Sequence, residues 1–333
     1  HDISADEETS AKACILLHDI GHGPFSHALE HSLVPGVSHE ELSVILMEEM
    51  NRQFEGKLDK AIKIFRNEYP KRFLHQLVSG QLDMDRLDYL SRDSFFSGVS
   101  EGIIGSSRII KMLNLHEGQL VVEAKGIYSI EKFLVARRLM YWQVYLHKTS
   151  VAAEKMLVNI LKRAKLLASG GVDLFGSPSL RYFLYNNADK MEFMQKGPAL
   201  NHFVMLDDAD FISAIKVWTG CDDLVLRELC TAFINRRLFK VEIKPEKSTP
   251  EELARWTERY SRHFGISEQE ASYFMADETV STDTYSAEDD TINILMKDGT
   301  IRDIAVASDM LNITVLTRKV QKHYFCYYKL SQN

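Results

Sequence analysis

The chain has 333 residues, 45% of them hydrophobic and 26% charged, and its formal net charge is −7. This balance is typical of a globular protein with a large core. It excludes a sequence-wide basic surface for duplex DNA or an anionic membrane, and no apolar run reaches the roughly 18 residues of a membrane helix. The four cysteines form no CxxC pair, which indicates reduced thiols in a cytoplasmic protein rather than a disulfide frame or a zinc ribbon.

The first elements are predicted to be helical, with a histidine-rich turn between them. Residues 8–19 carry apolar residues near helical spacing, and glycines and a proline then stop the helix within LLHDIGHGPFSH (16–27). A second helix is expected in SHEELSVILMEEMNRQF (38–54), because Ser38 and Glu41 have the spacing of a capping box. Residues 58–79 are expected to be further helix.

The middle of the chain predicts two long helical segments around a hairpin. QLDMDRLDYLSRDSFFSG (81–98) is expected to be a helix that Gly98 closes. HEGQLVVEAKG (116–126) alternates as a short β-hairpin would. Residues 129–168 contain no glycine or proline and form either one bent helix or two.

The C-terminal part mixes helices and strands after a turn-rich break at 169–178. The expected elements are a helix in 224–239, a strand in 239–245, a capped helix in 248–265, a hairpin in 291–304 and further strand in 312–329. The acidic segment 276–290 is expected to be a mobile loop. The predicted fold is mainly α, with a small β-hairpin and a smaller C-terminal α+β domain. The expected domains are a core at 1–168, a helical extension at 169–240 and the small α+β domain at 241–333, whose role is unknown.

The pair His18–Asp19 ends an apolar helix with a nitrogen donor beside a carboxylate, which are ligand types for a divalent metal. A lone pair of this kind is more often a helix C-cap with a hydrogen-bonded histidine. Five of the chain's twelve histidines, however, lie between His18 and His39, which favours a buried site.

A second cluster, Asp85, Tyr89 and Asp93, has i, i+4, i+8 spacing and shares one helical face. The alternative is a salt-bridged surface helix, because Arg86 and Arg92 lie among these residues. The neighbouring leucines favour partial burial, and a buried carboxylate needs a cation or hydrogen-bond donors.

In a third cluster, Arg137, Tyr141, Tyr145 and Lys148 lie on one side of a long helix. The alternative is a core stripe with flanking charges. A face that offers guanidinium, phenols and ammonium would also suit a polyphosphate and a sugar.

Taken in order, the motifs HD, GHGPFSH, HEE, DMDRLDYLSRD and YLHK resemble the HD superfamily of metal-dependent phosphohydrolases. Within it they are most similar to the deoxynucleoside triphosphate triphosphohydrolase branch, which includes the SAM- and HD-domain dNTPase of animals and bacterial relatives. The resemblance covers about residues 10–165. It implies that His18, Asp19 and Asp85 bind a divalent ion (Mn, Mg, Fe, Ni, Co or Zn). Family members have a further histidine about forty residues earlier, so we expect a fourth ligand before His1 in the natural chain.

The resemblance also implies the reaction, the hydrolysis of a deoxynucleoside triphosphate to deoxynucleoside and tripolyphosphate, in a homo-oligomer. It assigns catalytic roles near the attacking water to His22, His27 and His39. It assigns substrate contacts to Arg86, Tyr89, Asp93, Arg137, Tyr145, His147 and Lys148. Asp93 would accept a hydrogen bond from the 3′-hydroxyl, and Tyr145 would pack against the 2′ carbon. Two alternatives stay open: an HD phosphohydrolase acting on nucleoside monophosphates or cyclic nucleotides, and a catalytically silent nucleotide-binding protein.

Overall fold

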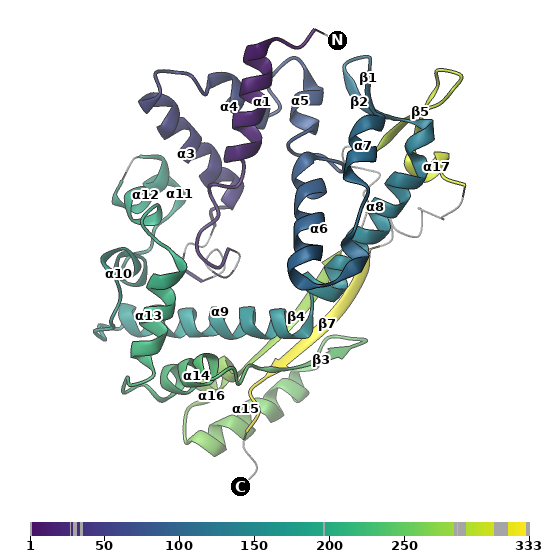
Figure 1. Cartoon of the computed structure of the whole chain (residues 1–333). Helices are drawn as coiled ribbons and strands as arrows, with labels where there is room; N and C mark the ends of the chain where they lie inside the picture. Colours follow the sequence, from purple (N-terminus) through teal and green to yellow (C-terminus); the bar gives the residue numbers. More distant parts are fainter. Residues whose placement is uncertain are drawn as a thin grey trace. The chain divides into compact units, whose positions relative to one another are not determined.

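The structure is a computed structural model that describes residues 2–26, 28, 32–33, 36–195, 197–282, 285, 291–309 and 319–330 (Figure 1). Two compact units interleave along the chain. Unit 1 comprises His1–Asp19, Leu46–His147 and Ser281–Val320; unit 2 comprises Ile20–Ile45, Lys148–Val280 and Gln321–Asn333. Both are mainly helical with small β parts, which confirms the predicted fold class. The domain boundaries at 168 and 240 remain predictions.

Unit 1 contains helices from the first half of the chain and strands from both halves. Its helices are α1 (Ala5–Leu17), α4 (Asp59–Phe65), α5 (Arg72–Gln76), α6 (Met84–Ser97), α7 (Ser106–Met112), α8 (Ile127–Met140) and α17 (Ile304–Ala307), with the 3₁₀ turns η1 (Ser100–Gly102) and η2 (Ala124–Gly126). The division between the units falls within α3 (His39–Gln53).

The further helix expected at 58–79 is present as two short helices, because α4 and α5 are separate. Asn67 has a left-handed backbone with φ 58°, and Pro70 follows before α5 begins. Neither residue suits the interior of a right-handed helix, since proline lacks an N–H and restricts the residue before it.

α6 begins and ends at strong local signals. The side chain of Asp83 accepts from the backbone N–H of Arg86 at its start, and Gly98 at its end has φ 72°, a conformation that favours glycine. The long pattern at 129–168 is two helices rather than one. The π-helical turn η3 (Tyr141–Tyr145) follows α8 directly, and α9 (Lys148–Ser169) begins three residues later.

The sheet of unit 1 has the strand order β1-β2-β5-β6. The predicted hairpin is confirmed as β1 (Leu113–His116) and β2 (Gln119–Glu123), which pair antiparallel. The second predicted hairpin is confirmed as β5 (Asn293–Leu295) and β6 (Ile301–Asp303). β2 and β5 pair in parallel, so segments far apart in the sequence form one sheet.

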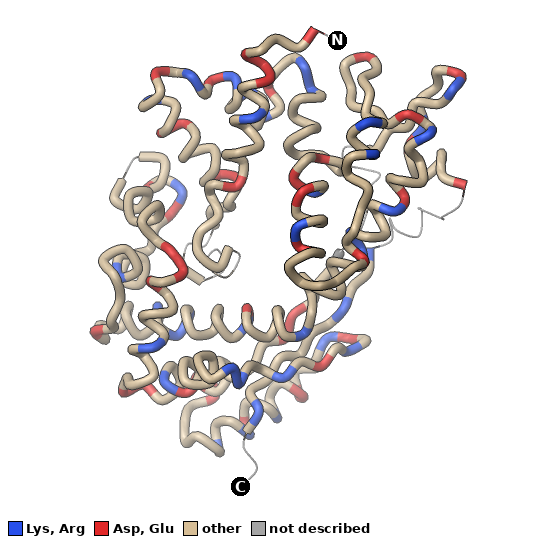
Figure 2. The backbone as a smooth tube through the Cα atoms, viewed as in Figure 1, with Lys and Arg blue, Asp and Glu red and all other residues tan. Residues whose placement is uncertain are grey.

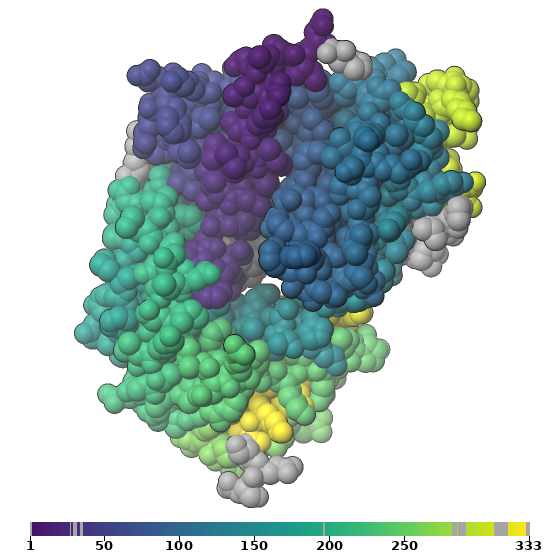
Figure 3. Space-filling model, in the orientation of Figure 1, coloured from purple at the N-terminus to yellow at the C-terminus, as the bar shows by residue number. Residues whose placement is uncertain are grey.

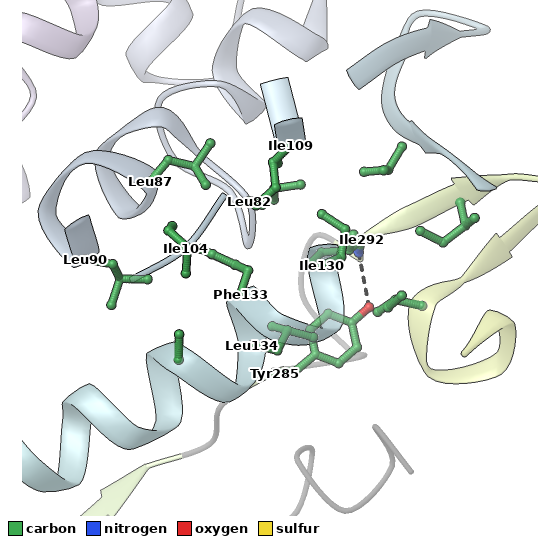
Figure 4. Close-up of a cluster of buried hydrophobic side chains, with 14 of the residues drawn as sticks. Leu82, Leu87, Leu90, Ile104, Ile109, Ile130, Phe133, Leu134, Tyr285 and Ile292 are labelled. Carbon is green, nitrogen blue, oxygen red and sulfur yellow. Dashed lines mark hydrogen bonds between the residues drawn. The ribbon is translucent and has the colours of Figure 1, made fainter. Parts of the chain in front are cut away.

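A hydrophobic cluster joins this sheet to α6 and α8 within unit 1 (Figure 4). Leu90 of α6 and Phe133 of α8 are both fully buried in it. Tyr285 closes one side of the cluster, and its hydroxyl accepts a hydrogen bond of 3.1 Å from the backbone N–H of Ile292. Burial of each large apolar side chain stabilises such a cluster by about 1.5–3 kcal/mol, so the cluster fixes α6 against α8.

Unit 2 is built on the long helix α9. Its other helices are α10 (Pro178–Tyr185), α11 (Lys190–Met194), α12 (Pro198–Phe203), α13 (Asp208–Trp218), α14 (Leu224–Ile234), α15 (Pro250–Phe264) and α16 (Glu268–Ala271), with the 3₁₀ turn η4 (Ser272–Phe274). Its sheet has the order β3-β7-β4, formed by β3 (Lys240–Lys244), β7 (Val320–Tyr327) and β4 (Met275–Thr282).

Aromatic residues pack α15 on this sheet. The ring of Trp256 lies 4.6 Å from that of Tyr327 and 5.6 Å from that of Phe325, measured between centroids. In Figure 3 yellow residues from the end of the chain are set among green residues of the same unit. The expected loop at 276–290 is wrong for its first part, because β4 extends to Thr282 and pairs with β7. In the part of the chain that the structure describes, no helix is long and apolar enough to cross a membrane.

Candidate active site

The metal ligands predicted in unit 1 begin where α1 ends. His18 is the C-cap of α1, and its Nδ1 lies 2.7 Å from the carbonyl oxygen of Ile15. Because a carbonyl oxygen can only accept, Nδ1 carries the proton and Nε2 is left to face other groups. Nε2 lies 3.3 Å from a carboxylate oxygen of Asp19 and 3.9 Å from one of Asp85.

Asp85 reaches this cluster from the first turn of α6. The nearby His18 imidazole is the main reason why the pKa of Asp85 is lowered, against the effect of its partial burial. The Asp85 carboxylate in turn raises the pKa of His18 to about 9, helped by the Ile15 carbonyl and by the charge of Asp19. The imidazole therefore stands between two carboxylates, and a divalent cation would compete with the proton for Nε2.

The donor set fits a divalent cation. One ligand atom each from His18, Asp19 and Asp85 lies within 4.8 Å of the other two. One imidazole nitrogen and two carboxylates suit borderline and hard cations, and three protein ligands leave coordination positions open. The Ile15 carbonyl orients the imidazole in the way that outer partners orient metal-binding histidines.

The predicted sugar-side residues of unit 1 also come together. The Tyr145 hydroxyl donates a hydrogen bond of 2.7 Å to Asp93 Oδ2. The ring of Tyr89 meets that of Tyr145 edge-on, with 6.0 Å between centroids. Burial and the contact with Asp93 raise the pKa of Tyr145, so its phenol stays a proton donor. Residues of α6 and η3 thus form one polar and aromatic face.

Arg137 of α8 is a buried cation. Its Nη1 donates to Gln81 Oε1 at 3.2 Å, and its guanidinium lies 5.9 Å from the centre of the Tyr141 ring. Among the residues that the structure describes, its Nε has no hydrogen-bond partner. A buried guanidinium with an unused donor favours an anionic ligand. The sequence analysis missed Gln81, since only folding brings this amide to Arg137.

Arg86, also predicted to contact substrate, is engaged at the start of α6. It forms an ion pair with the buried Asp83 and donates to the carbonyl of Gly80. Burial raises the pKa of Asp83, and the charge of Arg86 opposes this effect. The sequence analysis also missed Asp83, although an aspartate just before an apolar helical run is a recognisable N-cap signal. Charged residues of both signs follow one another along α6 (Figure 2).

The remaining candidates lie elsewhere in the chain. In unit 2 the rings of His22 and His39 are stacked, with 3.9 Å between centroids and 15° between planes. Lys148 is the first residue of α9 in unit 2, and His147 is exposed at the end of the second segment of unit 1. His27 lies outside the described residues.

A mainly helical chain whose His-Asp pair and later aspartate converge on one point is typical of a metal-dependent hydrolase, and comparison with known proteins supports this class. An HD domain matches residues 2–93, and an HD-associated region matches residues 104–173. A crystal structure of a phosphohydrolase from Bacteroides thetaiotaomicron is similar at 56% identity and a TM-score of 0.94, over 99% of this chain and 82% of that one. The chain belongs to the HD-domain phosphohydrolases, which are metal-dependent.

Other relatives are more distant. YwfO of Bacillus subtilis is 33% identical over 243 residues, which are 71% of this chain and 54% of YwfO. The deoxynucleoside triphosphate triphosphohydrolase SAMHD1 homolog of Dictyostelium discoideum is 26% identical over 181 residues, which are 49% of this chain and 35% of that protein. The chain therefore spans about half the length of YwfO and about a third of the SAMHD1 homolog.

Proposed function

We propose that this chain hydrolyses deoxynucleoside triphosphates to deoxynucleoside and tripolyphosphate. The observation that carries the proposal is the hydrogen bond between Tyr145 and Asp93, on the same face of α6 as Asp85. This pair offers a carboxylate for a sugar hydroxyl and an aromatic ring for the sugar carbons. The relationship to the SAMHD1 homolog is in keeping with this substrate.

The spacing along α6 supports attack at the α-phosphorus. Tyr89 and Asp93 lie one and two turns beyond Asp85, which is about 6 and 12 Å at 1.5 Å per residue. A sugar held at Tyr89 and Asp93 would have its attached phosphorus nearest to Asp85. The outer phosphates would then extend toward other cationic groups, of which Arg137 has a donor available.

The residues of unit 1 divide the work as follows. His18, Asp19 and Asp85 would hold the cation, which when bound supplies electrophilic activation of a phosphoryl oxygen and of water. Arg137 would offset the charge of the phosphates, and the Tyr145 phenol would orient the Asp93 carboxylate toward the 3′-hydroxyl. The family resemblance assigns proton transfer to His22 or His39, and this assignment stays a prediction.

One observation favours a second candidate, a phosphohydrolase of nucleoside monophosphates or cyclic nucleotides. Because Arg86 is paired with Asp83, it has less charge to offer to a long polyphosphate. A substrate with fewer phosphates would need fewer cations.

Product analysis on a panel of nucleotides tests the proposal. A deoxynucleoside triphosphate should give nucleoside and tripolyphosphate in equal amounts, with the ribonucleotide a poorer substrate. Phosphate or pyrophosphate as first product would mean attack at an outer phosphorus and would contradict the proposal. Turnover of monophosphates or cyclic nucleotides alone would establish the second candidate.

Two further expectations stay proposals: a homo-oligomer and a cytoplasmic location. Light scattering tests the first and cell fractionation tests the second.

A further inference from the structure

In unit 2 the backbone of Gly21 lies directly against the first turn of α3. Its N–H donates a buried hydrogen bond of 2.9 Å to Ser43 Oγ. A Cβ at this position would lie 2.1 Å from the His39 carbonyl oxygen and 2.4 Å from the Ser43 amide nitrogen. Such distances are far inside van der Waals contact, so only glycine permits this approach.

The Ser43 side chain ties this loop to α3. A serine within a helix commonly donates back to a carbonyl four residues earlier. Here the hydroxyl accepts from an amide 22 residues upstream, and the Ser43 side chain is fully buried. Loss of the Ser43 hydroxyl would remove the acceptor of the buried Gly21 N–H, and an unsatisfied buried donor is unfavourable.

The same turn of α3 carries one ring of the histidine stack. Ser43 follows His39 by four residues, so the two share a face of α3. A capping box fixes the start of the helix, with Ser38 N 3.1 Å from Glu41 Oε2 and Glu41 N 3.2 Å from Ser38 Oγ. His39 therefore projects from a well-defined first turn.

The other ring belongs to His22, which follows Gly21 in the chain. The two imidazoles lie 3.9 Å apart at 15°, which requires the loop backbone to be fixed relative to α3. The Gly21–Ser43 hydrogen bond is one residue away from the stack and joins the same two segments. We propose that Ser43 is a positioning residue whose hydroxyl fixes the Gly21 backbone and thereby holds His22 against His39. The relevance of this positioning role to catalysis rests on the proposed function. The role itself rests on the hydrogen bond and the histidine stack.

The test compares Ser43→Ala with Ser179→Ala in the full chain loaded with diamagnetic Zn²⁺. Ser179 is a matched control because it is also buried in unit 2 and its hydroxyl also contacts a histidine, His202, at 3.2 Å. Histidine-selective labelling and NMR report the stack, since each ring shifts the proton signals of the other upfield. The signals are assigned with His22→Gln and His39→Gln.

We expect Ser43→Ala to move the His22 and His39 signals toward those of free histidine, while Ser179→Ala leaves them in place. In steady-state kinetics kcat should fall about tenfold in Ser43→Ala with KM within twofold, because the loss affects alignment rather than binding. If Ser43→Ala does not fold, Ser43→Cys decides, because the thiol leaves no cavity and its sulfur accepts only weakly. It should shift the same signals by less.

Unchanged His22 and His39 signals in a folded Ser43→Ala or Ser43→Cys protein would overturn the proposal, whatever the activity. The NMR measurement uses no nucleotide. Absence of tripolyphosphate release by the wild type would therefore contradict the proposed function alone, and the role of Ser43 would still be decided.

Discussion

The hydroxyl of Tyr145 donates a hydrogen bond of 2.7 Å to Asp93, which joins the π-helical turn after α8 to the last turns of α6. π-helical turns are rare and often occur at functional sites. Here the turn lies in the segment that carries Tyr145. Substitutions of Tyr145 can therefore distinguish a role in the proposed sugar recognition from a role in packing.

Tyr145→Phe keeps the ring and removes the donor. We expect KM for a deoxynucleoside triphosphate to rise severalfold to tenfold, because Asp93 loses its orienting partner, while the preference for deoxyribose is kept. Tyr145→Ala should lower the ratio of deoxy to ribo kcat/KM about tenfold, since the ring no longer excludes a 2′-hydroxyl. Steady-state kinetics on matched nucleotide pairs measures both effects. Tyr128→Phe, at an exposed tyrosine of the same unit, is the control. An unchanged ratio in Tyr145→Ala would place the sugar elsewhere.

Asp85→Asn should remove most of the bound metal and lower kcat/KM by a hundredfold or more, because a carboxylate ligand becomes a neutral amide. Elemental analysis of the purified variant gives the metal content directly. The control is Asp88→Asn on the same helix, an exposed carboxylate that pairs with Arg92 at 2.6 Å. Full metal occupancy in Asp85→Asn would show that Asp85 is not a ligand.

Arg137→Ala should raise KM for triphosphates about tenfold or more, because a charge-assisted contact to phosphate is worth about 1.5–3 kcal/mol. Arg137→Lys should recover only part of this, since an ammonium cannot reproduce the guanidinium fork. Arg138→Ala, at the next residue of α8, is the matched control. If the kinetics of Arg137→Ala are those of the wild type, the contact with Gln81 is structural and Arg137 does not meet substrate.

The sequence correctly predicted those elements that depend only on residues close to one another in the chain. The i, i+4, i+8 spacing of Asp85, Tyr89 and Asp93 needs only helical geometry, and the Lys-Asp-Gly-Thr turn specifies the β5–β6 hairpin by itself. The parallel pairing of Val122 with Ile294 is different, because no pattern in either segment refers to the other. The expected loop at 276–290 failed for the same reason. The polar residues of β4 are held as a strand by pairing with β7, which lies at the end of the chain.

The contacts of the candidate site also divide into those between sequence neighbours and those that depend on packing. His18 and Asp19 are adjacent in sequence and their pairing was predictable, whereas the contact of Arg137 with Gln81 depends on how α8 packs. The ion pair of Arg86 with the buried Asp83 is local. Its effect on the charge available to a phosphate depends on burial, which the sequence does not give.

The last prediction concerns the anchoring of α1, the helix that ends at His18. Glu7 is buried near the start of α1, where its carboxylate lies 2.8 Å from Lys71 Nζ and accepts a hydrogen bond of 2.9 Å from the Tyr69 hydroxyl. The hydrogen bond from Lys71, followed by that from the Ser4 backbone, lowers the pKa of Glu7 from 4.5 to about 2. Because the pKa is lower in the folded state, ionised Glu7 stabilises the fold fully above pH 4.5, and this contribution is lost as the pH falls toward 2.

Glu7→Gln should therefore lower the urea midpoint of unfolding at pH 7, and the difference from the wild type should shrink between pH 4.5 and 2. Urea titrations at several pH values measure this difference, and Glu55→Gln, at an exposed glutamate of the same unit, should change the midpoint little at any of them. Since α1 carries His18 at its end, Glu7→Gln should also weaken metal binding modestly at neutral pH, which a competition titration with a chelator detects. A difference in midpoint that stays constant from pH 7 to pH 2 would mean that Glu7 stabilises the fold by packing rather than by its charge.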